Sequence, residues 1–61
     1  MKKTYRISEL TGRAHDRAVK DAARELNEAF HFNIDAKDVT LVEETADDFG
    51  LRYTAAGTWT I

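Results

Sequence analysis

The sequence predicts a small, single-layer α+β domain: a three-stranded antiparallel sheet that carries two helices on one face. Three observations lead to this fold class. Stretches near both ends of the chain alternate polar and apolar residues, and a period of two is typical of strands. Residues 12–30 repeat their apolar positions at helical spacing. Residues 38–49 carry a second, shorter helical pattern.

Length and composition confine the prediction to one domain, residues 1–61. A chain of 61 residues buries about 60 % of its unfolded surface and builds one small core. The chain has neither cysteine nor proline, so we expect no disulfide and no cysteine-bound zinc. No apolar run is long enough for a membrane span or a signal sequence. We therefore expect a soluble, unprocessed protein of the reducing cytoplasm.

The first strand is expected at residues 4–7, where Tyr5 and Ile7 alternate with polar side chains. The first helix follows from Gly12 to about Phe30. Its apolar stripe is built mostly from alanine, the best helix former, and its small side chains allow close packing against a sheet. The stripe consists of Ala14, Ala18, Val19, Ala22, Ala23, Leu26, Ala29 and Phe30.

Residues 38–49 fit two structures. Val39 begins a run of four residues with strand propensity, and a strand there would return through a hairpin at residues 46–50. A helix instead accounts for the spacing of the apolar residues, for Asp38 as an N-cap and for Gly50 just beyond the C-terminal end. We favour the helix.

The remaining two strands are expected at residues 51–55 and 58–61, with a tight turn at Ala56 and Gly57. In this arrangement the sheet and the connector after the first helix bury their apolar side chains under the alanine stripe. The predicted core residues outside the helices are Tyr5, Ile7, Phe32, Ile34, Leu51, Tyr53, Ala55, Trp59 and Ile61.

Two stretches resemble small phage-encoded proteins. Residues 5–11, followed by Ala14 and Ala18, are similar to the strand, E-L-S segment and alanine-stepped helix at the start of many such proteins. Residues 46–53 are similar to the exit of their second helix, an A-x-x-[IF]-G-[LI]-x-[IY] pattern that enters a strand. The resemblance implies a β-α-α-β miniprotein. Some small acidic phage proteins of this general kind are anti-CRISPR or anti-restriction inhibitors that occupy nucleic-acid sites on host defence enzymes.

No pattern of catalytic or metal-binding residues appears, so we expect neither an enzyme nor a cofactor. The chain lacks a glycine-rich phosphate loop, a Ser/His/Asp arrangement and an HExxH motif. His15 and His31 lie about 24 Å apart along a straight helix, too far to share a metal ion. We interpret His15 as a packed, hydrogen-bonded histidine rather than as a ligand or acid/base group.

The charges are segregated along the chain. Residues 35–48 hold six acids against Lys37 alone, whereas the remainder holds five acids against eight bases. On a helix, four of these acids form like-charge i, i+4 pairs, each unfavourable by a few tenths of a kcal/mol. Clustered carboxylates resemble a row of phosphates to a protein groove lined with lysine and arginine. The alternative is a solvated face without function. We call the six acids the acidic ridge: Glu43, Glu44, Asp47 and Asp48, flanked by Asp35 and Asp38.

The leading hypothesis is a non-enzymatic, anti-CRISPR-like inhibitor. Its acidic ridge would mimic nucleic acid and block the basic groove of a host defence complex in an infected bacterium. We expect a monomer that binds this protein partner and neither nucleic acid nor membrane. One alternative is an antitoxin-like or regulatory module that binds through its sheet edge or first helix. A third is a nucleic-acid binder that uses bases of the N-terminal half, namely Lys2, Lys3, Arg13, Arg17 and Arg24.

Overall fold

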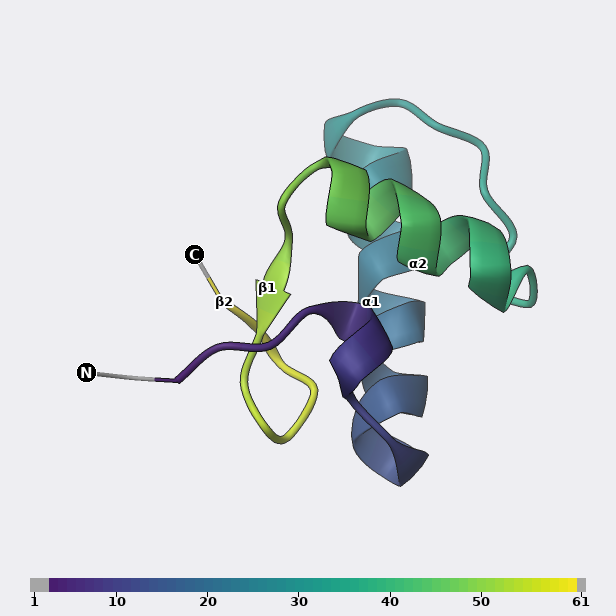
Figure 1. Cartoon of the computed structure of the whole chain (residues 1–61). Coiled ribbons are helices and arrows are strands. Elements are labelled where there is room, and N and C mark those ends of the chain that lie inside the picture. The colour runs from purple at the N-terminus through teal and green to yellow at the C-terminus, as the bar shows by residue number, and fades with distance from the viewer. Residues whose placement is uncertain (1–2, 61) are drawn as a thin grey trace.

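Two helices cross each other and a small hairpin packs beside them (Figure 1). The computed structural model describes residues 3–60. In chain order, the elements are the 3-10 helix η1 (Ile7–Glu9), the helices α1 (Gly12–Ala29) and α2 (Val39–Asp48), and the strands β1 (Arg52–Tyr53) and β2 (Trp59–Thr60). Within residues 3–60, no helix combines the length and the apolar character needed to cross a membrane.

The first predicted helix is confirmed as α1, whose small side chains form the centre of the core. Ala18, Ala22 and Leu26 are completely buried, and Val19 and Ala23 are nearly so. Because most of these side chains are alanine, both α2 and η1 approach α1 closely. The core of this domain is therefore a layer of small residues on α1 that larger side chains from the other elements cover.

The helical interpretation of the second segment is also confirmed. The Asp38 Oδ1 accepts a hydrogen bond from the Leu41 N–H at 3.3 Å and caps the first turn of α2. Val42 and Ala46, one turn apart, are fully buried against α1. Gly50 follows α2 with φ of 71°, a left-handed conformation that glycine adopts without steric cost.

The predicted three-stranded sheet is wrong. Within residues 3–60 the sheet has two strands, β1 and β2, which pair antiparallel with Tyr53 opposite Trp59. The N-terminal stretch meets β1 at one isolated bridge, where Tyr5 and Tyr53 exchange backbone hydrogen bonds of 2.8 and 2.9 Å. Each strand is two residues long, shorter than predicted, and Ile61 lies outside the described residues.

A local hydrogen bond explains why the first strand does not continue. The Glu9 Oε1 accepts the Arg6 N–H at 2.7 Å, which favours the turn of η1 over an extended chain. Ile7, predicted to end a strand, therefore begins η1 and points into the core with no exposed surface. The Arg52 side chain holds the N-terminal stretch instead, because its guanidinium donates to the Thr4 hydroxyl and carbonyl oxygens.

Three of the core residues predicted outside the helices lie at the surface, as do Ala29 and Phe30 at the end of the α1 stripe. Trp59 is 38 % exposed, Phe32 is 38 % exposed, and Ala55 in the hairpin turn is exposed as well. Tyr53, the partner of Trp59 in the register, takes the buried position with no exposed surface.

Candidate functional site

The structure divides the α2 carboxylates of the acidic ridge into two pairs. Glu43 and Asp47 are partly buried and lie on the side of α2 that faces other elements. The Glu43 Oε2 lies 3.4 Å from the His15 Nε2 on α1. The Asp47 Oδ2 accepts a hydrogen bond from the Ser8 hydroxyl of η1 at 3.3 Å. These two carboxylates therefore make contacts within the fold.

His15 has a partner that the sequence did not predict. Its side chain is 23 % exposed and packs where α1 meets α2, beside the Glu43 carboxylate. The contact joins residues 28 positions apart, so it depends on how the two helices cross. His15 and Glu43, a member of the acidic ridge, thus both form part of the packing between α1 and α2.

Glu44 and Asp48 point away from the fold, and we call them the outward pair. Both are exposed, and they lie one helical turn apart on α2. Among the ion pairs within residues 3–60, neither has a lysine or arginine partner. An i, i+4 pair of like charges costs a helix a few tenths of a kcal/mol. Nothing in the described chain compensates this repulsion with a cation.

The flanking acids Asp35 and Asp38 are exposed and also support local structure. The Asp35 Oδ1 accepts the Lys37 N–H at 2.9 Å, which stabilises the turn before α2. Asp38 is the N-cap of α2. Ten residues separate it from Asp48, a rise of about 15 Å. The exposed carboxylates of the acidic ridge are thus spread along the whole of α2 and the turn before it.

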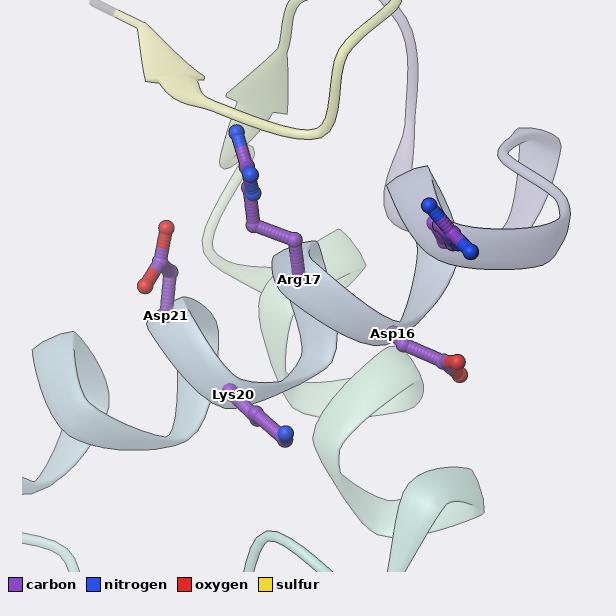
Figure 2. Close-up of a pocket in the computed structure, with 5 residues that line it drawn as sticks. Asp16, Arg17, Lys20 and Asp21 are labelled. Atoms are coloured by element: carbon purple, nitrogen blue, oxygen red, sulfur yellow. The ribbon is translucent and has the colours of Figure 1, made fainter.

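The bases of α1 line a shallow groove of about 290 Å³ together with acids. Figure 2 shows Arg17 pointing toward the hairpin, while Asp16 and Lys20 point to the other side of the helix. Asp21 also lines the groove and accepts a hydrogen bond from Arg24 at 3.3 Å. A groove of mixed sign fits a solvated face better than a phosphate-binding surface. Of the bases in the nucleic-acid alternative, Lys2 lies outside the described residues.

Sequence reasoning missed an exposed aromatic cluster, formed by all three phenylalanines of the chain. The ring centroids are 4.6 Å apart for Phe30 and Phe49, 5.4 Å for Phe32 and Phe49, and 6.3 Å for Phe30 and Phe32. The three residues remain 38–44 % exposed. The signal in the sequence was the position of Phe30 and Phe49 at the C-terminal ends of the two helical patterns.

The Tyr53 hydroxyl is the most strongly perturbed titratable group of the described chain. Burial raises the pKa of Tyr53 to about 12, and the carboxylates of Asp21, Glu25 and Asp47 add to the increase. The hydroxyl has no hydrogen-bond partner within residues 3–60. Tyr53 is a core residue, and its perturbation follows from packing under α1 rather than from an open cleft.

Within the part of the chain that the structure describes, no three histidine, aspartate or glutamate side chains are placed to hold a metal ion. Comparisons with protein-family models, with curated proteins and with solved structures find no match to this chain. Function is therefore inferred from the two surfaces described above, the outward pair on α2 and the aromatic cluster beside it.

Proposed function

We propose that the protein is a non-enzymatic inhibitor whose α2 carboxylates occupy a basic, nucleic-acid-binding groove on a protein partner. The observation that carries this proposal is the outward pair. Glu44 and Asp48 are exposed, one turn apart, and without a lysine or arginine partner in residues 3–60. A helix under selection for stability alone would be expected to place a cation at one of these positions.

The spacing of the exposed carboxylates supports mimicry of a phosphate backbone. Four residues of α-helix rise about 6 Å, so Glu44 and Asp48 repeat on the few-ångström scale of successive phosphates. Asp38 and Asp35 extend the negative surface toward the N-terminal end of α2. Such a surface attracts a lysine- and arginine-lined groove over long range and speeds association. The same surface repels nucleic acid itself.

The proposed partner is a host defence complex of an infected bacterium, and the inhibitor acts as a monomer. The resemblance of residues 5–11 and 46–53 to small phage proteins supports this origin. Within the acidic ridge, we assign the main contacts to Glu44 and Asp48 and the flanking contacts to Asp35 and Asp38. Glu43 and Asp47 contribute less, because His15 and Ser8 hold their carboxylates against the fold.

Charge reversal at the outward pair tests the proposal without disturbing contacts inside the fold. Immobilised wild-type protein and its Glu44→Lys, Asp48→Lys and Asp16→Lys variants would be used to capture partners from a bacterial lysate. Asp16 is the matched control, since it is an exposed helical acid on the mixed-charge face of α1. We expect Glu44→Lys and Asp48→Lys each to weaken capture about tenfold or more, and Asp16→Lys to change it by less than about twofold.

Equal losses in all three variants would contradict the proposal, because they would reflect net charge rather than a site on α2. The melting temperature serves as the control for folding. It should stay constant or rise slightly in Glu44→Lys and Asp48→Lys, since each change removes a like-charge pair.

A second function is favoured by the aromatic cluster. Exposed, mutually packed aromatic rings are typical of protein interaction surfaces, which suits an antitoxin-like or regulatory module. A captured partner without any nucleic-acid-binding activity would favour this function over the inhibitor.

A further inference from the structure

The aromatic cluster of Phe30, Phe32 and Phe49 lies where the C-terminal ends of α1 and α2 come together (Figure 1). Its rings pack with tilted and edge-on geometry, which stabilises aromatic pairs beyond their buried area. Yet each of the three residues keeps 38–44 % of its surface exposed. Together they leave roughly 250 Å² of surface in water, a contiguous aromatic patch just below the range of about 300–600 Å² that is typical of the largest patch on a soluble monomer.

The backbone holds Phe32 in this exposed position. The Asn27 side chain pairs with the backbone of Ile34, donating to its carbonyl oxygen at 2.9 Å and accepting its N–H at 2.8 Å. Between Phe30 and Phe32, His31 has φ of 58°, a left-handed conformation that costs a non-glycine residue about 1–2 kcal/mol. The Asn27 hydrogen bonds and the strained backbone of His31 thus fix the loop that carries Phe32, and they hold the rings in one arrangement, as in preorganised binding surfaces.

The charges around the cluster indicate what it binds. The stretch that meets there, residues 25–51, contains eight acids and a single base, Lys37. Glu28 and Asp48, close in sequence to Phe30 and Phe49, are both exposed. A second copy of the chain docked on this surface would bring like charges together, which disfavours a symmetric dimer. A partner surface with lysine or arginine around an apolar side chain would complement both the aromatic rings and the acidic residues around them.

We propose that the aromatic cluster is an anchor site for an apolar side chain on a basic protein segment. The rings receive an aliphatic or aromatic side chain, and Glu28 and Asp48 pair with lysine or arginine beside it. Apolar anchors inside a charged rim are the usual source of affinity in small interfaces. The inference rests on the proposed function, because it adds an apolar contact to the same basic partner that the outward pair binds.

Two synthetic peptides test the anchor site. Both are amphipathic helices with the same leucines at helical spacing; one carries lysine and arginine at its polar positions, and its twin carries glutamate. Amide chemical shifts of labelled protein would be followed in a titration with each peptide. We expect the basic peptide to shift amides at residues 28–32 and 48–50, and the acidic twin to bind at least about tenfold more weakly.

Substitutions at the cluster complete the test. Phe32→Ser and Phe49→Ser should each weaken binding of the basic peptide about tenfold or more, whereas Leu41→Ser should change it less than about twofold. Leu41 is a matched control, since it lies on α2 outside the cluster and is 43 % exposed, against 44 % for Phe49. Should Phe49→Ser unfold the protein, Phe32→Ser and the wild-type shift map still decide the question.

The test distinguishes failure of the anchor site from failure of the proposed function. A clear preference for the basic peptide that survives both phenylalanine substitutions would overturn the anchor site and leave the proposed function standing. Equal binding of the two peptides would overturn the requirement for a basic partner and count against the proposed function as well. A concentration-dependent dimer that Phe49→Ser abolishes would replace the basic partner with a second copy of the chain.

Discussion

Raising the pH from about 10 to about 12 is expected to unfold the protein through ionisation of Tyr53. Its phenol is fully buried, and its hydroxyl has no hydrogen-bond partner among residues 3–60. Burial raises its pKa most, followed by the negative charges of Asp21, Glu25 and Asp47. A tyrosinate at this position would be a buried anion beside three carboxylates, so ionisation favours the unfolded chain, in which the phenol reaches water.

The size of the effect follows from the pKa difference between the folded and unfolded chain. The pKa of Tyr53 is about 12 in the folded protein, against an ordinary value of 10.0. Because the folded-state pKa is raised, the stabilisation is fully present below pH 10 and is lost as the pH rises through 12. The difference corresponds to about 2–3 kcal/mol, a large part of the stability expected for so small a domain.

Two single substitutions isolate this tyrosine. The chain has two tyrosines, so in Tyr5→Phe the tyrosinate absorbance reports Tyr53 alone. We expect that absorbance and the loss of helical circular dichroism to change together, near pH 12. In Tyr53→Phe, the helical signal should persist through this range. Ionisation of Tyr53 near pH 10 with the helices intact would refute the reasoning, as would identical alkaline unfolding of Tyr53→Phe and wild type.

Three substitutions test the packing of the other elements. Gly57→Ala should detach the hairpin from α1 and lower the melting temperature sharply. The added Cβ would lie 2.1 Å from the Ala14 carbonyl oxygen, and Gly57 has a φ of +83° that alanine adopts only with strain. A melting temperature equal to that of wild type would contradict this contact. Asp38→Ala should cost about 1 kcal/mol in denaturant unfolding, since the Leu41 N–H loses its cap, whereas Asp38→Asn should retain most of that stability. Trp59→Ala should cost less than about 3 kcal/mol, the lower limit for a buried tryptophan, because Trp59 is 38 % exposed. A larger loss would show that Trp59 belongs to the core.

The helices could be predicted from the sequence because their determinants are local. The alanine stripe of α1 is set by spacing alone, and α2 has its cap at Asp38 and its terminating glycine at Gly50. The sheet could not be predicted in this way, because the spacing of apolar residues does not show which of two competing local structures forms. Alternation over residues 4–7 favoured a strand, but the hydrogen bond between Arg6 and Glu9 favoured a turn, and the turn prevailed.

The candidate site was predicted in part, for a related reason. Helical spacing places the α2 acids on one side of the helix, but the direction from which α1 and η1 approach decides which of them stay in water. His15 and Ser8 sit 28 and 39 residues before their carboxylate partners, so only the folded chain shows that Glu43 and Asp47 turn inward. The aromatic cluster escaped prediction because Phe32 was assigned to the core from its hydrophobicity alone.

Competition with nucleic acid tests the central claim most directly. A partner captured by the wild-type protein would be bound to labelled duplex DNA or RNA, whichever it recognises, and titrated with wild-type protein and with the Glu44→Lys, Asp48→Lys double variant. We predict that the wild-type protein displaces the nucleic acid completely, less effectively as salt is raised, and that the double variant fails to displace it. A ternary complex in which the partner holds both the protein and the nucleic acid would contradict the claim that the outward pair occupies the nucleic-acid groove.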